Sequence, residues 1–226
     1  MSNYLVIDLE TGSKEYYGQK ANFLYNKIVA IGLCKDNEIY SRYIYPYPLD
    51  NLVLGGIDIL VGHNISFDLL YLWSLDDLQN YFKRGGKIWD TMLAEYIISG
   101  QQHKFPALRD IAVNKYGCKE RTKEMEEYWN KGIDTSDIPK ELVLKDVEQD
   151  VLDTEQIYLA QLEKAKYLGM TRLIELQGDA ILATTEMKYN GLKIDLEVLE
   201  ANKKSLIQSI KQEEEKLNEL VNRYWK

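Results

Sequence analysis

The chain has 226 residues, of which 45% are hydrophobic and 28% are charged, a composition typical of globular proteins. Its net charge of −8 argues against a protein that holds long nucleic acid by phosphate neutralisation alone. The chain has only two histidines, which does not favour zinc chemistry. No run approaches the ~20 apolar residues of a membrane helix, and no signal peptide begins the chain. We therefore expect a cytoplasmic protein without a membrane partner.

The first part of the chain predicts strands. Residues 3–9 alternate, and residues 28–34 form the nearly continuous apolar run of a strand buried on both faces. Residues 38–45 alternate again and are rich in Tyr and Ile. Short apolar segments at 57–62 and 87–89 predict two more strands.

Helices are expected between and after the later strands. The pattern predicts a helix at about 67–82, which Ser66 or Asn64 could cap, and another at 91–98. A helix, a loop and a second helix are expected over 104–166. Strands first and helices interleaved afterwards indicate an α/β domain with a mixed sheet.

A second segment is expected from about Gly169. A helix at 170–187 and a turn at 190–191 precede a long charged helix that Asp195 caps and that runs to residue 226. This helix carries a heptad-like apolar seam, so it packs either on the preceding helix or on a partner outside the chain. The seam residues are Leu199, Leu206, Ile210, Leu217, Val221 and Tyr224.

Paired acids stand at the end of the first strand. Asp8 and Glu10 are two residues apart, so their side chains point to the same face and repel unless a cation lies between them. The pair predicts half of a site for a divalent ion such as Mg²⁺ or Mn²⁺, although a solvated strand end is the simpler alternative. Asp68 stands in the first turn of a predicted helix, where an acid also stabilises the helix start.

A third acidic segment lies on the predicted helix that ends near 166. Asp146 and Asp150 are four residues apart and share a helix face, and Asp153 follows. A solvated acidic stripe is the default interpretation of such a face.

Three motifs in this order resemble the exonuclease motifs of the DEDD superfamily of 3′→5′ exonucleases, and most of all the proofreading domain of family A DNA polymerases. They are Ile7–Gly12, His63–Asp68 and Val147–Thr154. Trp89–Ala94 and Phe105–Gly117 are similar to segments that the family places between them. The resemblance covers roughly residues 3–165.

The resemblance implies a ribonuclease H-like fold, with a mixed β-sheet flanked by helices and followed by a C-terminal helical hairpin. Residues 1–168 would form the exonuclease domain. Residues 186–195 are similar to the junction between exonuclease domain and polymerase thumb, so residues 169–226 resemble the start of a thumb. A polymerase domain C-terminal to this chain is the expected partner, in the host cytoplasm if a phage encodes it.

The resemblance also assigns a site with two divalent metal ions, Mg²⁺ or Mn²⁺. Asp8, Glu10 and Asp150 would hold one ion, and Asp8 and, through water, Asp68 the other. The 3′ end of single-stranded DNA would be bound by two sets of residues. Leu9, Thr11 and Gly12 would contact the terminal nucleotide, and Asn64 and Phe67 the penultimate one, although Phe67 can equally be a core aromatic.

Asp146 departs from the family pattern. The polymerase branch has a tyrosine there that orients the attacking water, and other branches have a histidine one residue earlier, at Lys145. Asp146 could act as a catalytic base or as a ligand through water. Alternatively, Tyr128 or Tyr116 supplies the hydroxyl, or the domain hydrolyses slowly or not at all.

The predicted function is therefore a metal-dependent 3′→5′ exonuclease that hydrolyses single-stranded DNA ends to nucleoside 5′-monophosphates as a proofreading module. The alternatives are an RNA-trimming exonuclease of the same superfamily and a catalytically silent module that binds a single-stranded end or stabilises its polymerase.

Overall fold

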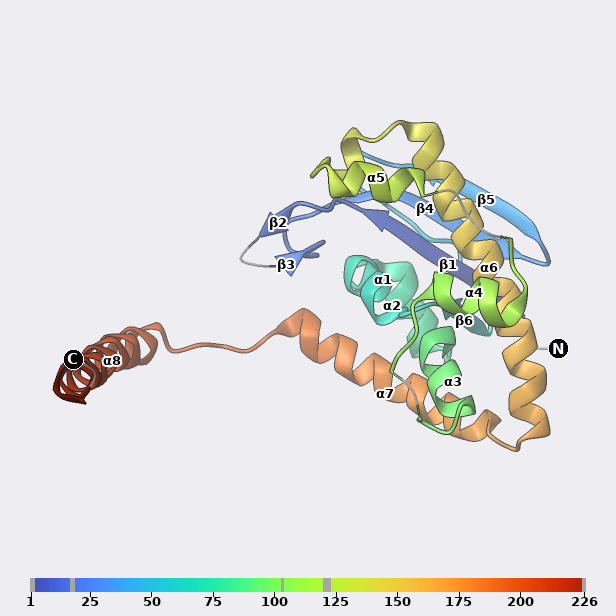
Figure 1. The fold of residues 1–226 in the computed structure, drawn as a ribbon. Helices are drawn as coiled ribbons and strands as arrows, with labels where there is room; N and C mark the ends of the chain where they lie inside the picture. Colours follow the sequence, from blue (N-terminus) through green and yellow to red (C-terminus); the bar gives the residue numbers. More distant parts are fainter. Residues whose placement is uncertain (1–2, 17–18, 103, 120–122, 225–226) are drawn as a thin grey trace. The chain divides into compact units, whose positions relative to one another are not determined.

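A five-stranded mixed sheet forms the centre of the chain (Figure 1). The computed structural model describes residues 3–16, 19–102, 104–119 and 123–224. The strand order is β5-β4-β1-β6-β7, in which β4 runs antiparallel to β1 and β5, while β1, β6 and β7 are parallel. The strands are β1 (Tyr4–Thr11), β4 (Ile28–Lys35), β5 (Glu38–Tyr43), β6 (Ile59–Gly62) and β7 (Lys87–Asp90).

The five predicted strands are all present, with ends that differ by up to two residues. The structure adds a hairpin of two-residue strands, β2 (Glu15–Tyr16) and β3 (Gln19–Lys20), which the sequence pattern did not predict. Strands this short carry no period that a pattern could show.

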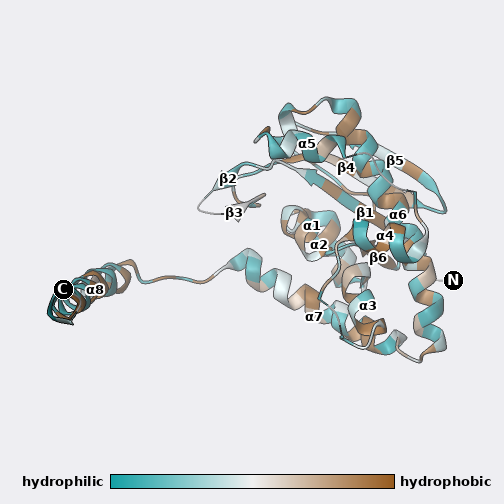
Figure 2. Cartoon of the chain, in the orientation of Figure 1, coloured by the Kyte–Doolittle hydropathy of each residue, from teal (hydrophilic) through white to brown (hydrophobic). Residues whose placement is uncertain are grey.

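Helices cover both faces of the sheet. The helices α1 (Ser66–Leu72) and α2 (Asp76–Lys83) pack with Ile7, Leu9 and Leu60 in one apolar cluster. On the opposite face, α6 (Lys140–Tyr167) crosses the strands, and its Val147 and Val151 lie in clusters with Val29 and Val6. Apolar segments of strands and helices accordingly face each other in the interior (Figure 2).

The helix expected at 67–82 is two helices, so that prediction was wrong. Leu75 has extended backbone, with φ −75° and ψ 128°, and the Gln79 side chain donates to the carbonyl of Trp73 at 2.8 Å. The break lets both helices turn apolar side chains into the same cluster. Neither Asn64 nor Ser66 caps α1, because the N-cap position is Ile65 and no side chain caps it.

Three α-helices, not two, occupy the segment expected to hold a helix, a loop and a helix. They are α4 (Leu108–Tyr116), α5 (Glu124–Asn130) and α6, with a 3₁₀ turn at Thr135–Asp137. The helix α3 (Thr91–Ile98) has the predicted bounds.

The chain divides into two compact units, residues 1–189 and 190–226. The helix α7 (Thr171–Asn190) packs within the first unit, where Ile174 and Gly178 are buried. The second unit contains α8 (Leu196–Tyr224), capped by the carboxylate of Asp195 as predicted; its expected end at 225–226 lies outside the described residues. Both the domain boundary after residue 168 and the hairpin of the last two helices stay predictions.

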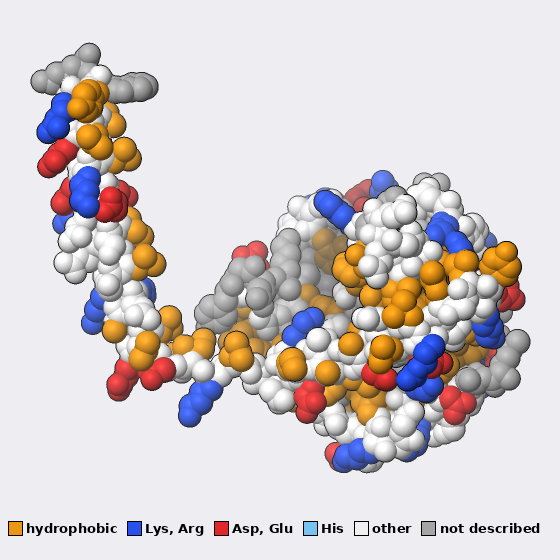
Figure 3. Space-filling model, turned by 90° about the horizontal axis from the view of Figure 1, so that it is seen from below, with side chains coloured by type: hydrophobic (Ala, Val, Ile, Leu, Met, Phe, Trp, Pro, Cys, Tyr) orange, Lys and Arg blue, Asp and Glu red, His pale blue; other side chains and the backbone are white. Residues whose placement is uncertain are grey.

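Apolar side chains of α8 are exposed along its length (Figure 3). No described residue of this helix is buried. Among the described residues, no helix is both long and apolar enough to cross a membrane.

Candidate active site

Three carboxylates from two elements meet near the C-terminal end of β1, the central strand of the sheet. Side chains alternate along β1, so Ile7 and Leu9 face α1 and α2, while Asp8 and Glu10 face the side of α6. Asp150 of α6 joins them, and one oxygen of each of the three acids lies within 4.8 Å of the others. All three side chains are half-buried.

Close packing of α6 on the sheet brings Asp150 to this place. Gly32 of β4 is the residue paired with Asp8, and a Cβ built on it would lie 2.9 Å from the carbonyl oxygen of Val147. The absence of a side chain at Gly32 therefore lets the helix backbone approach the strand next to Asp8.

Asp68 reaches the same strand from α1. It is 3% exposed, and its carboxylate accepts a hydrogen bond of 3.0 Å from the backbone N–H of Leu9. Leu9, which lies between Asp8 and Glu10, thus links Asp68 to β1 by a hydrogen bond. Of the four predicted metal ligands, the structure brings Asp8, Glu10 and Asp150 within reach of one ion.

The electrostatics of the acids are unfavourable without a cation. Burial raises the pKa of Glu10 well above its ordinary value, and the charges of Asp150 and Asp146 raise it further. Burial also raises the pKa of Asp68, against the opposing effect of the hydrogen bond from Leu9. Closely spaced oxygen donors whose charges repel one another are a donor set that suits a divalent cation.

Asp146 lies one helical turn before Asp150 and is almost fully buried. Its carboxylate is 3.4 Å from a guanidinium nitrogen of Arg109, and Arg109 also forms an ion pair with Glu126. The sequence pattern gave no sign of this contact, since Arg109 and Asp146 are 37 positions apart.

The predicted contacts of the terminal nucleotide lie at the end of β1. The side chain of Leu9 is buried in the core, and Thr11 is buried as well. The N–H of Gly12 donates to the carbonyl of Lys27 at 2.9 Å. Any contact of Leu9 with substrate would therefore involve its backbone, and its N–H already bonds to Asp68.

The second predicted pair is on the loop and first turn before Asp68. Asn64 is exposed and has a φ of 57°, and the ring of Phe67 packs on Tyr71 with centroids 5.2 Å apart. Phe67 is half-buried, so it has both a core contact and an accessible edge.

Asp90 organises this loop, a role that sequence reasoning missed. Its carboxylate accepts backbone N–H groups of Asn64 and Ile65 on the loop and of Met92 and Leu93 in α3. The signal was available, because an aspartate directly before a helix is a favoured N-cap. The hydrogen bonds that Asp90 accepts from Asn64 and Ile65 depend on the tertiary fold.

His63 has a structural environment. Its ring nitrogens lie 2.9 Å from the Thr91 hydroxyl and 3.1 Å from the carbonyl of Pro106. Burial lowers the pKa of His63 to about 4, so the imidazole is neutral at physiological pH.

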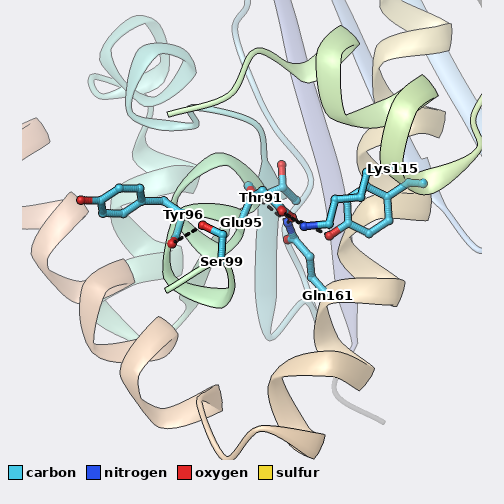
Figure 4. Close-up of polar contacts among 7 residues, drawn as sticks. Thr91, Glu95, Tyr96, Ser99, Lys115 and Gln161 are labelled. Atoms are coloured by element: carbon cyan, nitrogen blue, oxygen red, sulfur yellow. Dashed lines mark hydrogen bonds and ion pairs between the residues drawn. The ribbon is translucent and has the colours of Figure 1, made fainter. Parts of the chain in front are cut away.

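The hydroxyl of Tyr116, one of the two candidates to replace the family tyrosine, belongs to a different cluster. It donates to Glu95 at 2.5 Å, and Glu95 also contacts Lys115 and Gln161 (Figure 4). Gln161 lies about three turns of α6 beyond Asp150, so this cluster is remote from the acids. Tyr128, the other candidate, packs with Val29 and Ala30.

A cavity of about 840 Å³ begins directly after the end of β1. Ser13 and Lys14 form one wall, and Trp129 and Ile133 of the α5 region contribute apolar surface. Asp134 holds the walls together, because its carboxylate accepts the N–H groups of Ser13 and Lys14.

The fold is ribonuclease H-like: a mixed five-stranded sheet lies between helices, and three acids gather on the central strand and the crossing helix. This confirms the fold class that the three motifs predicted. No family description and no curated protein matches the chain.

Solved structures with this fold include NrnC from Brucella melitensis with bound Mg²⁺, with a TM-score of 0.62 at 14% identity over 84% of this chain and 87% of that one. NrnC bound to pGG gives a TM-score of 0.61, also at 14% identity, over 84% of this chain and 86% of that chain. The POL domain of Pol1 from M. smegmatis, in complex with DNA primer-template and dNTP, gives 0.63 at 15% identity.

The match to Pol1 covers 94% of this chain and 33% of that chain. The chain thus shares its fold with these structures, and it spans about a third of the polymerase structure that it resembles.

Proposed function

We propose that the chain is a metal-dependent 3′→5′ exonuclease that removes nucleoside 5′-monophosphates from single-stranded DNA ends, as the proofreading module of a family A polymerase. The observation that carries this proposal is the meeting of Asp8, Glu10 and Asp150, with Asp68 bonded to the strand between the first two. The fold shared with a nuclease structure that binds Mg²⁺ supports it.

The residues have separate tasks in this proposal. Asp8, Glu10 and Asp150 would hold one divalent ion, Mg²⁺ or Mn²⁺, and Asp8 with Asp68 a second. Two such ions supply an activated water at neutral pH and charge stabilisation for the attacking and leaving oxygens. The strand holds two of the donors in position, because Asp8 and Glu10 are paired with Gly32 and Ala30 of β4.

Substrate contacts follow the same end of the sheet. Thr11 and Gly12 would face the terminal nucleotide, and Asn64 and Phe67 the one before it. The cavity next to Ser13 is large enough for a nucleotide, and Trp129 gives it an aromatic surface on which a base can stack.

The test is a degradation assay with 5′-labelled oligonucleotides in Mg²⁺, in Mn²⁺ and in EDTA. We expect stepwise shortening of single-stranded DNA with either metal and none in EDTA. Asp8→Ala should lower the rate at least about 10²-fold, because it removes a ligand of both ions. Asp179→Ala, at an exposed acid of α7, is the matched control and should retain full activity.

Three results would contradict the proposal. Near-full activity of Asp8→Ala would place the site elsewhere. Faster degradation of a ribo-oligonucleotide than of its deoxy counterpart would favour the RNA-trimming alternative. Binding without cleavage in both metals would favour the silent module.

A further inference from the structure

Arg109 brings a cation to the edge of the acid group. It lies in α4, and its two terminal nitrogens pair with carboxylates on either side: Glu126 of α5 and, at 3.4 Å, Asp146 of α6. Asp146 is one turn before Asp150, so the guanidinium lies beside the helix face that carries the metal acid.

This cation acts on the site electrostatically. Of the charged groups that act most on Glu10, Asp150, Asp146 and Asp68 raise its pKa, and Arg109 lowers it. A phosphodiester that approaches a set of carboxylates is repelled until cations compensate for their charge. Arg109 provides a permanent positive charge beside Asp146, in addition to the charge of any metal ions.

The side chain is held but accessible. Its neighbour Asp146 is 10% exposed, whereas the side chains of Arg109 and Glu126 are 31% and 40% exposed. A guanidinium carries five N–H donors, and each of the two ion pairs involves a single nitrogen. The group can therefore bind a phosphate oxygen while Asp146 still holds it, and the more exposed Glu126 is the partner that a phosphate would displace.

We infer that Arg109 binds a backbone phosphate of the substrate strand next to the hydrolysed bond, that Asp146 positions its guanidinium, and that Glu126 competes with the phosphate for it. The inference rests on the proposed function. It gives Asp146 a positioning role through Arg109, in place of the water-orienting role of the tyrosine that the family has there.

The test is equilibrium binding of a short 5′-fluorescein oligodeoxythymidylate to the full chain in EDTA, measured by anisotropy at several salt concentrations. Arg109→Gln should weaken binding about tenfold, the effect of one lost charged hydrogen bond. It should also reduce the slope of log K against log salt by about 0.7, the value for one phosphate contact with single-stranded DNA. Arg109→Lys keeps the charge and should restore the slope but only part of the affinity.

Arg172→Gln is the matched control, because Arg172 is an exposed arginine of α7 that pairs with Glu175. It should leave affinity and slope unchanged. Glu126→Gln removes the competing carboxylate and should tighten binding about twofold, which keeps the inference testable if Arg109→Gln does not fold.

Weaker binding of Arg109→Gln with an unchanged salt slope would mean that Arg109 has only a structural role, and it would overturn the inference. The inference would also fail if Arg109→Gln bound the oligonucleotide as tightly as Arg172→Gln does. Weaker binding by Glu126→Gln would also contradict it. These outcomes do not depend on cleavage. A chain that binds with the expected slopes but never cleaves loses the proposed function alone.

Discussion

Glu10 has an environment in which its proton and a metal ion compete. Burial and the carboxylates of Asp150 and Asp146 raise its pKa, so the metal-free folded protein holds a proton on Glu10 more tightly than the unfolded chain does. Glu10 therefore contributes stability at low pH, and this contribution is lost as the pH rises through the raised pKa.

This predicts a pH-dependent effect of Glu10→Gln in EDTA. At low pH, below the raised pKa of Glu10, the variant and the wild type should have similar melting temperatures, because a protonated glutamate resembles glutamine. As the pH rises through the raised pKa, the wild type alone acquires the negative charge, and the variant should become the more stable protein. A difference of about 1 kcal/mol would appear as a Tm shift of about 2–4 °C in a chain of this size.

Added Mg²⁺ should reverse the order at the higher pH by stabilising the wild type. Thermal unfolding followed by circular dichroism measures both effects. A variant that loses stability relative to the wild type as the pH rises in EDTA would contradict the electrostatic account of the site.

The shared face of Asp8 and Glu10 could be predicted from the period of a strand. The pairing of Asp150 with them came from the resemblance of the three motifs, because the local pattern alone indicates a solvated helix face. The partners of these acids could not be predicted. The contact of Arg109 with Asp146 and the two loop amides bound by Asp90 join segments far apart in sequence, and no local period reports such contacts.

Among the elements, α6 and β4 determine the width of the site. Gly32 lets the helix lie close to the strand, and Val147 and Val151 both come within about 3 Å of the place a Cβ would occupy. The distance from Asp150 to Asp8 therefore depends on a contact made by a glycine that carries no functional group.

Gly32→Ala should push α6 outward at this point. The new methyl group would lie 2.9 Å from a backbone oxygen, which a side-chain rotation cannot relieve, so we expect a loss of about 1–3 kcal/mol of stability. Activity should fall more than stability explains, because small displacements of catalytic groups have large effects on rate.

Denaturant unfolding and the degradation rate measure the two effects. Gly55→Ala is the control, since no atom lies within 4 Å of the corresponding position. A Gly32→Ala protein with unchanged activity would show that the separation of Asp150 and Asp8 tolerates movement of the helix.

The elements that sequence predicted well are those with long apolar periods, such as β1, β4 and α3. One helix was predicted over 67–82 where the structure has two, because Leu75 continues the apolar period of the sequence. The break is stabilised by the tertiary contact of Asp77 with the N–H of Leu52 and by the contact of Gln79 with Trp73. Local helix propensity does not report either of these two contacts.

At the scale of the molecule, the predicted site residues belong to one unit. Every predicted site residue lies within residues 1–189, and no described residue of α8 is buried. The stability of the first unit should therefore not depend on the second.

Removal of residues 190–226 should leave the melting temperature within about 2 °C of that of the full chain and leave degradation unchanged. The helical signal in circular dichroism should fall, because α8 is lost. A large drop in melting temperature would mean that α8 stabilises the first unit after all.

The hydrogen bond from Leu9 to Asp68 gives the site its own spectroscopic reporter. The N–H of Leu9 donates to a carboxylate that the proposed function assigns to a metal ion, so its chemical shift should change when a cation binds there. In a ¹⁵N-labelled sample this single backbone resonance would allow metal and oligonucleotide titrations to be followed at the proposed metal site without any attached label.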